Sequence, residues 1–268
     1  MRRPRSPLVP LTAAALSATA AYLLWSRRPG PSGHPTRPAG APKGAHTRLL
    51  EAGSMALQIR PPLKGFDVYL VGFHPKKDDP EHQWEAHHWC RQVNEDFAEC
   101  VLFDGNTWDA NLVGIEYIIS ERLFERLPDE ERRFWHPHNG EILSGQLIAP
   151  GLPEMAEKAL MRHKMNSYGK TWHLWDTGMG DRPGDELPFG PARLAWSFSR
   201  DGELQHWLLE GRDRRMGLDT EAKRRARRDL IRLAHPQEGV DLLKDRFAGP
   251  TRDIPGVVDR RAPVPVRG

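Results

Sequence analysis

Short stretches of apolar, β-branched and aromatic residues alternate with polar turns through the middle of the chain, a pattern that predicts β-strands. The stretch at 112–120 is almost continuously apolar, which is typical of a strand buried on both faces. Residues 168–175 pass from a loop into a further aromatic strand. The other predicted strands are residues 67–73, 87–93, 97–103, 141–148, 193–199 and 204–209.

Helices are predicted between these strands, where a capping residue precedes helix-forming residues. Ser120 is a predicted N-cap of a short helix, and Pro153 opens a helix that runs to about Asn166. Asp219 precedes a basic helix at 220–234. Strands joined mostly by short turns, with a few helices beside them, predict an α+β fold with a mainly antiparallel sheet in a single compact domain.

The two ends of the chain differ from the middle. Residues 1–28 contain an uncharged run flanked by arginines and are expected to be a membrane anchor or a signal segment. Residues 29–57 are rich in Pro and Gly and form a predicted linker, which precedes the folded domain at 58–249. The Pro- and Arg-rich residues 250–268 are expected to be a disordered tail. The expected localisation is therefore a membrane, through an N-terminal helix, or export to the cell envelope.

The overall charge adds little about partners, because 39 basic residues nearly balance 36 acidic ones. A mean hydropathy of −0.63 excludes a multi-span membrane protein. The six basic residues of helix 220–234 are interpreted as a solvated surface, with acidic lipid headgroups as the alternative partner. Nucleic acid is not expected, because no known nucleic-acid-binding module accompanies this charge.

Two cysteines are too few for a disulfide scaffold, but their positions are informative. A hairpin centred on Glu95 places Cys90 directly opposite Cys100, since both are five residues away from its centre. Opposed positions on one sheet face lie about 4.5–5.5 Å apart. A disulfide between the two cysteines is therefore geometrically feasible, provided that the domain faces an oxidising compartment.

The strongest candidate for chemistry is the pair His136 and His138, which point to the same face if the segment is extended. Glu141 joins them if the chain bends near Gly140. Two imidazoles and one carboxylate form a ligand set suited to a divalent transition metal. The alternative is a polar loop in which Pro137 and Gly140 serve only as turn residues.

A second candidate is Glu116, which lies inside the apolar strand at 112–120. An unpaired carboxylate buried there is costly, so it needs a cation, a metal ion or a proton. A salt bridge to Arg or Lys is the alternative to a place in the histidine site. His87 and His88 are adjacent, so only one of them can face that site from the same strand.

Several segments, taken in order, carry a resemblance to a known family. They are residues 94–97, 100–104, 112–120, 135–138, 144–147 and 168–172. Together they are similar to the oil-body-associated protein family, over about residues 65–217. The resemblance implies proximity to a lipid surface, since plant members associate with oil bodies, and it brings no catalytic mechanism. The composition, rich in Arg, Pro and Ala, indicates a bacterial member with an added N-terminal segment.

These observations support two hypotheses about function. The first is a protein of unknown biochemical activity that acts at or near a membrane or lipid surface. The second is a metal-binding protein or metal-dependent enzyme, with His136, His138 and Glu116 as ligands of a divalent transition metal. The sequence leaves open whether the protein is an enzyme, which small molecule it binds, and its oligomeric state.

Overall fold

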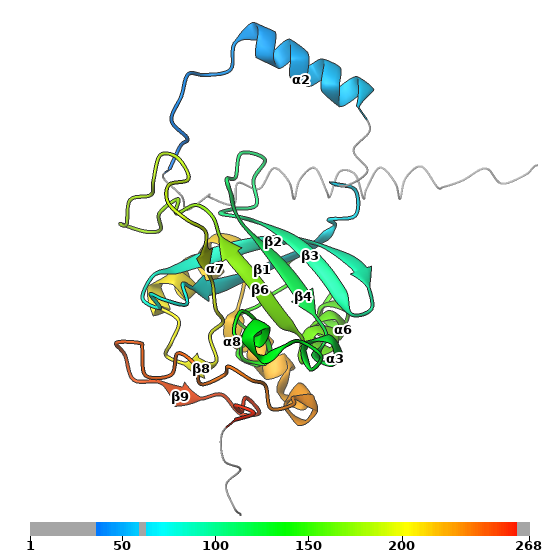
Figure 1. The fold of residues 1–268 in the computed structure, drawn as a ribbon, viewed down its shortest axis with the longest axis vertical. Helices are drawn as coiled ribbons and strands as arrows, with labels where there is room; N and C mark the ends of the chain where they lie inside the picture. The colour runs from blue at the N-terminus through cyan, green and yellow to red at the C-terminus, as the bar shows by residue number, and fades with distance from the viewer. Residues whose placement is uncertain (1–35, 59–62, 262–268) are drawn as a thin grey trace, which may run out of the picture.

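The computed structural model describes residues 36–58 and 63–261. Within these residues, seven strands form one antiparallel sheet in the order β1-β2-β3-β4-β6-β5, with β7 paired to β6 (Figure 1). The strands are β1 (Val68–Pro75), β2 (Gln83–Asn94), β3 (Phe97–Phe103), β4 (Leu112–Ile119), β5 (His136–Pro137), β6 (Tyr168–His173) and β7 (Arg193–Leu194). A separate pair joins β8 (Arg200–Asp201) to β9 (Arg252–Asp253). The sheet confirms the predicted α+β class.

The helices lie around this sheet, and their starts follow the sequence signals. The Ser120 and Asp219 side chains accept hydrogen bonds from the backbone N–H groups of Leu123 and Ala222, so both are N-caps as predicted. Pro153 stands at the N-cap of α6, as expected for a helix that it opens. The helices are α2 (Ala45–Leu57), α3 (Glu121–Phe124), α4 (Asp129–Arg132), α5 (Asn139–Leu143), α6 (Glu154–Lys164), α7 (His206–Met216), α8 (Thr220–Ala226) and the 3₁₀ helix η2 (Arg228–Leu233).

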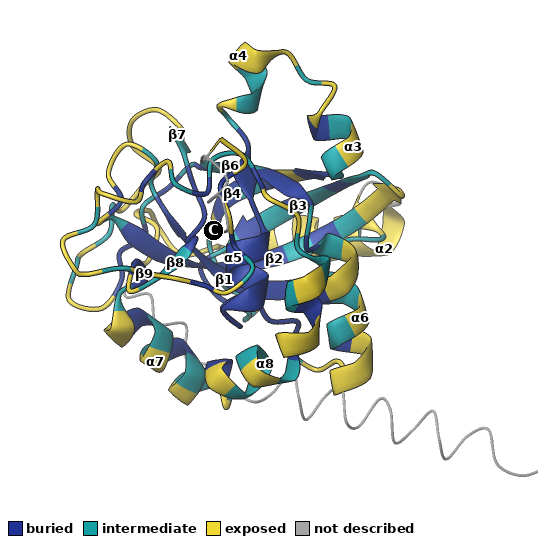
Figure 2. Cartoon of the chain, turned by 90° about the horizontal axis from the view of Figure 1, so that it is seen from below, coloured by how far each residue is buried: buried dark blue, intermediate teal, exposed yellow. Residues whose placement is uncertain are grey.

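The main core lies on one face of the sheet, here called the inner face. Alternate residues of the strands supply its apolar side chains, and α5, α6 and η2 cover it with Ile142, Met161 and Leu230. All residues of α5 are buried, whereas α6, α7 and α8 keep exposed sides (Figure 2). Each fully buried aliphatic side chain contributes roughly 1.5–3 kcal/mol, so this core is the main source of stability.

The hairpin of β2 and β3 has the predicted register. Cys90 pairs directly with Cys100, and their Cα atoms are 4.0 Å apart. The two cysteines form a disulfide, which lies among the buried residues of the inner face. The bond ties the centre of the sheet together next to the strand β4 that carries Glu116.

Two predicted strands are wrong. Residues 141–148 were expected to be extended, but α5 occupies the start of this stretch and only Ile148 bridges to β1. Gly140 in α5 packs against the backbone carbonyl of Phe198, which a Cβ atom at this position would approach to 2.5 Å. Residues 204–209 were also expected to be a strand, but α7 begins at His206. Short apolar runs fit a strand and a buried helix equally well, which explains both errors.

The basic helix predicted at 220–234 is α8 followed by η2, and much of its charge is neutralised within the chain. Arg227 is fully buried and donates to Glu157 of α6 and to the carbonyl oxygen of Ile142. Arg224 makes a bidentate ion pair with the carboxylate of Asp201. These contacts make the helix part of the packed domain, in which buried charges require partners.

Of the two predicted ends, the C-terminal one needs correction. Residues 250–261 are packed rather than disordered, since β9 pairs with β8 and both Ile254 and Val257 are buried. The expected anchor or signal, within residues 1–28, lies outside the described residues. Across residues 36–58 and 63–261, no helix combines the length and the apolar character needed to cross a bilayer. This finding corrects the localisation expected from the sequence as far as the described residues reach: none of their helices can be the expected membrane anchor.

Candidate metal centre

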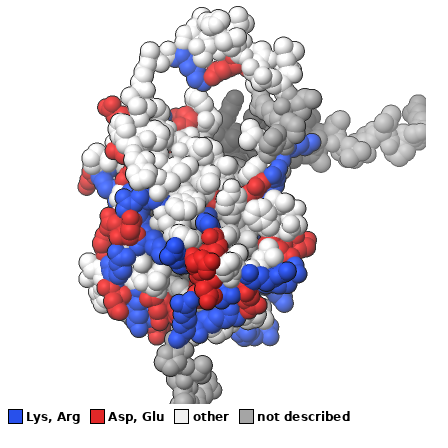
Figure 3. Space-filling model, viewed as in Figure 1, with Lys and Arg blue, Asp and Glu red and all other residues white. Residues whose placement is uncertain are grey.

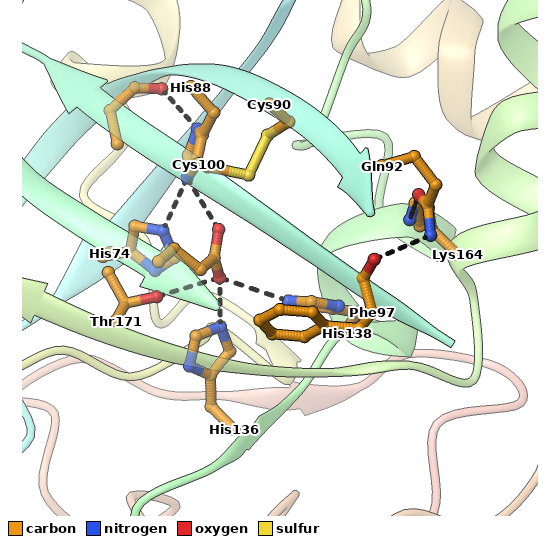
Figure 4. The surroundings of a disulfide bond; sticks show 12 residues. His74, His88, Cys90, Gln92, Phe97, Cys100, His136, His138, Lys164 and Thr171 are labelled. Atoms are coloured by element: carbon orange, nitrogen blue, oxygen red, sulfur yellow. Dashed lines mark hydrogen bonds and ion pairs between the residues drawn. A yellow bond between two sulfur atoms is a disulfide. The ribbon is translucent and has the colours of Figure 1, made fainter. Parts of the chain in front are cut away.

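Five strands place polar side chains at one position of the inner face. The register aligns Glu116 of β4 with Thr171 of β6, and His136 of β5 with Gly169 two residues earlier on β6. His88 of β2 enters from the other side of β4, since β3 separates the two strands. The sheet curls, so the histidine rings from its two sides point toward one another beside the disulfide (Figure 4).

The distances between these atoms match the edges of a metal coordination polyhedron. Ligand atoms about 2.0–2.2 Å from a tetrahedral ion lie about 3.3–3.6 Å from one another. A charge-assisted hydrogen bond would be shorter, at about 2.7–2.9 Å. The measured separations are 3.2 Å between the Nε2 atoms of His74 and His88, 3.3 Å from His88 Nε2 to Glu116 Oε2, 3.4 Å from His136 Nε2 to Glu116 Oε1, and 3.5 Å from His138 Nε2 to Glu116 Oε1.

Hydrogen bonds at Nδ1, the ring nitrogen that points away from the centre, fix the tautomers of His74 and His88. The Nδ1 atom of His74 lies 2.9 Å from the carbonyl oxygen of Trp196, and that of His88 lies 3.1 Å from the carbonyl oxygen of Ala86. A carbonyl oxygen can only accept, so each Nδ1 carries the proton. Each neutral ring therefore turns the lone pair of Nε2 toward the centre, the orientation that metal-bound histidines adopt.

The tautomer of His138 is fixed in the same way, whereas His136 differs from the other three histidines. Ser167 donates its hydroxyl proton to the carbonyl oxygen of Lys164, so its oxygen accepts from Nδ1 of His138 at 2.8 Å. The Nε2 atom of His138 thus also presents a lone pair. Both ring nitrogens of the fully buried His136 lack a hydrogen-bond partner within the described part of the chain. A buried imidazole without partners is costly, and a metal ion bound at Nε2 would satisfy one of its two nitrogens.

The protonation states favour cation binding. Burial lowers the pKa of His74, His88 and His136 to about 4, so these rings are neutral at pH 7. Burial acts to raise the pKa of Glu116, but His136 and His138 hold it well below its ordinary range. Neutral imidazoles and a carboxylate are the forms that bind metal ions. The hydroxyl of Thr171 donates to Glu116 Oε1 at 2.8 Å and helps to orient the carboxylate.

Glu141 reaches the same place from the first turn of α5. Its Oε1 atom is buried, has no hydrogen-bond partner among the residues that the structure describes, and lies 3.8 Å from Nδ1 of His74. Burial, followed by the nearby charge of Glu116, raises the pKa of Glu141 well above its ordinary range. The bend that the sequence required is thus the start of a helix.

Gly169 leaves an open space at the centre of these atoms. A Cβ atom at this position would lie 2.3 Å from Glu116 Oε1 and 2.6 Å from the Nε2 atoms of both His136 and His138. The φ angle of Gly169 is not in the left-handed region, so the backbone does not demand a glycine here. The glycine is required for space, and the space is bounded by metal-ligating atoms. The residues present therefore fit a metal ion.

The structure brings together most of the residues predicted for the site. Glu116, His136, His138 and Glu141 converge, and His88 joins them. His87 does not, because it faces the opposite side of β2. There its Nε2 atom donates to Glu85 and its Nδ1 atom accepts from the hydroxyl group of Tyr69.

The sequence reasoning missed three members of the site, His74, Gly169 and Thr171. The signal for His74 was weak, because this residue lies one position beyond the strand predicted at 67–73. In the structure it belongs to β1 and shares the inner face with Gly72, two residues earlier. Only the pairing of β1 with β2 brings His74 to His88.

A curled antiparallel sheet with buried histidines and carboxylates on its inner face defines an α+β protein with an internal polar centre. Residues 60–231, which include every residue of that centre, match the family model described as "Protein of unknown function (DUF1264)". The chain is 36% identical over 197 residues to oil body-associated protein 1B of Arabidopsis thaliana, covering 74% of this chain and 79% of the relative. It is 35% identical over 232 residues to oil body-associated protein 2A of Zea mays, covering 85% and 90%.

The chain therefore belongs to the oil-body-associated protein family, which confirms the resemblance seen in the sequence. No solved structure matches this chain. These relatives carry names that refer to oil bodies, and the names state no biochemical activity.

Proposed function

We propose that this protein binds a divalent first-row transition-metal ion through Glu116, His136 and His138. One observation carries the proposal. The Nε2 atoms of the two histidines and Oε1 of Glu116 lie within 4.8 Å of one another, all buried, around the space that Gly169 leaves open. Among the described residues only the Thr171 hydroxyl donates to this group, so the facing acceptors Glu116 Oε1 and His138 Nε2 need a cation between them.

The donor set narrows the class of metal. Imidazole nitrogen combined with carboxylate oxygen suits Zn²⁺, Fe²⁺, Mn²⁺ or Co²⁺ better than Ca²⁺ or Mg²⁺, which prefer oxygen alone. Ser167 on His138 and Thr171 on Glu116 supply the outer hydrogen bonds that orient such ligands. Each ligand side chain is almost completely buried, as in closed sites that stabilise a fold.

The test is the metal content of the full-length chain, purified without a histidine tag and measured by mass spectrometry. We expect at least one equivalent of a transition metal in the wild type, and the loss of at least one in a His136→Gln, His138→Gln variant. His87→Gln is the matched control, because this buried histidine lies on the other face of β2 and should leave the metal content unchanged. A folded wild-type chain that takes up no metal from Zn²⁺ or Mn²⁺ solutions would refute the proposal.

We infer a second function, contact with a lipid surface, from the names of the relatives and from an apolar end of the molecule. Trp108 is 98% exposed and Phe189 is 64% exposed. Their loops are joined by the segment before α2, in which Arg37 pairs with Asp109 and Ala39 donates to the carbonyl oxygen of Glu186. Helix α2 has no buried residue and stands at the same end, where charged side chains are sparse (Figure 3).

Flotation with oil droplets coated by a phospholipid monolayer tests this contact. The full-length protein should float with the droplets, and a Trp108→Ser, Phe189→Ser variant should float several-fold less. Leu242→Ser is the control, since Leu242 is 47% exposed but lines a pocket rich in charged residues. Equal flotation of all three proteins would argue against this surface as the lipid contact.

A further inference from the structure

We infer that the centre holds two metal ions, bridged by the carboxylate of Glu116. The inference rests on the proposed function and extends it from one ion to two. The first ion lies at Glu116 Oε1 with His136 and His138. The second lies at Glu116 Oε2 with His74 and His88, a group of three whose ligand atoms are also within 4.8 Å of one another.

The two oxygens of Glu116 serve different histidines. Oε1 faces His136 and His138 at 3.4 and 3.5 Å, whereas Oε2 faces His88 at 3.3 Å. In the sheet order, His88 lies in β2 on one side of β4, and His136 lies in the edge strand β5 on the other side. A carboxylate with a separate nitrogen group at each oxygen has the arrangement of a bridge between two ions, which such bridges hold about 3.5–4 Å apart.

His74 and His88 show independently that a second cation is needed. Their Nε2 atoms are only 3.2 Å apart, which is close enough for a hydrogen bond. However, the carbonyl oxygens of Trp196 and Ala86 hold the proton of each ring on Nδ1. Two lone pairs then face each other inside the protein. They repel each other unless a cation accepts both, and 3.2 Å is close to the separation of two nitrogens bound to one ion.

Glu141 lies next to the two ion positions. It forms a third compact group with His74 and His136, and these two histidines belong to different halves of the centre. Within the described residues its Oε1 atom has no hydrogen-bond partner, and it lies 3.8 Å from Nδ1 of His74. Two divalent cations also need more negative charge than Glu116 alone provides, and Glu141 is the further carboxyl group at the site.

The experiment counts metal ions per chain. The full-length protein, freed of metal with a chelator and purified without a histidine tag, is titrated with Zn²⁺ and analysed after gel filtration. We expect two equivalents in the wild type and one equivalent in a His74→Gln, His88→Gln variant. His87→Gln should retain two. One equivalent in the wild type would overturn the inference and leave the proposed function standing, whereas no bound Zn²⁺ in a folded wild type would overturn both.

A second measurement keeps the inference testable if the double variant does not fold. Wild-type protein loaded with one and then two equivalents of Mn²⁺ is followed by electron paramagnetic resonance. Two Mn²⁺ ions that share a carboxylate are magnetically coupled, so the signal at two equivalents should lose the form seen for isolated ions. A spectrum that simply doubles in intensity would show two separate sites and overturn the bridged pair.

Discussion

The substitution Gly169→Ala tests the metal centre through a single methyl group. Gly169 lies in β6, where it pairs with Ile118 of β4 and with His136 of β5. Alanine is compatible with an extended strand, so the backbone should tolerate the change. The added Cβ atom, however, would point between Glu116 and the two histidines and fill the space assigned to the ion.

The expected magnitude follows from the distances. The Cβ atom would approach Glu116 Oε1 to 2.3 Å and the Nε2 atoms of His136 and His138 to 2.6 Å, all below the 3.0 Å limit of real contacts. The carboxylate oxygen must therefore retreat by at least about 0.7 Å, whereas metal–ligand distances tolerate only about 0.2 Å. We expect the Zn²⁺ affinity to fall at least about 100-fold, or about 2.8 kcal/mol.

The assay is competition for Zn²⁺ against a chromophoric chelator, together with thermal unfolding followed by circular dichroism. In the wild type, Zn²⁺ at about 100 times its Kd should add about 2.7 kcal/mol and raise Tm by about 5–10 °C. Gly169→Ala should show neither effect. Gly53→Ala is the control, because no atom lies within 4 Å of a Cβ atom there. Wild-type affinity in folded Gly169→Ala protein would refute the assignment of an ion to this space.

Two further predictions concern stability. Burial raises the pKa of Glu203 to about 7, although its carboxylate accepts from the N–H groups of Ser199 and Arg200. A raised carboxyl pKa stabilises the fold below about pH 4.5, and this stability is lost as the pH rises through 7, by about 3 kcal/mol in total. Denaturant unfolding at several pH values should show Glu203→Gln without this loss, and parallel pH profiles for the two proteins would count against it. Replacing Cys90 and Cys100 by Ala should lower the free energy of unfolding by about 2–3 kcal/mol, because the disulfide joins two residues that are 10 positions apart and so closes a loop. An unchanged midpoint of urea unfolding would contradict this prediction.

The elements that the sequence predicted well are those with a local pattern. The two runs on either side of the polar turn at Glu95 placed β3 and most of β2, and the equal distances of Cys90 and Cys100 from Glu95 set their register. Glu116 could be singled out because a carboxylate in an apolar strand is an energetic anomaly wherever the strand lies. His136 and His138 were found by their spacing alone.

The elements that were missed depend on contacts that a single sequence does not contain. His74 is an ordinary residue of β1 until the sheet brings it to His88, fourteen positions away. The helical turn at Asn139–Leu143 packs through Gly140 against Phe198, a residue far along the chain. The role of Gly169 becomes visible only when β4 and β5 pair with its own strand, β6. Such information lies in the tertiary structure, which overrides local preference.

The most direct test of the metal centre is a crystal structure of the Zn²⁺-loaded full-length protein with data collected at the zinc absorption edge. We predict an anomalous peak about 2.0–2.2 Å from Glu116 Oε1 and from the Nε2 atoms of His136 and His138. A second peak is predicted between His74, His88 and Glu116 Oε2. A map with no anomalous peak among these side chains, from protein that is folded and exposed to saturating Zn²⁺, would contradict the central claim.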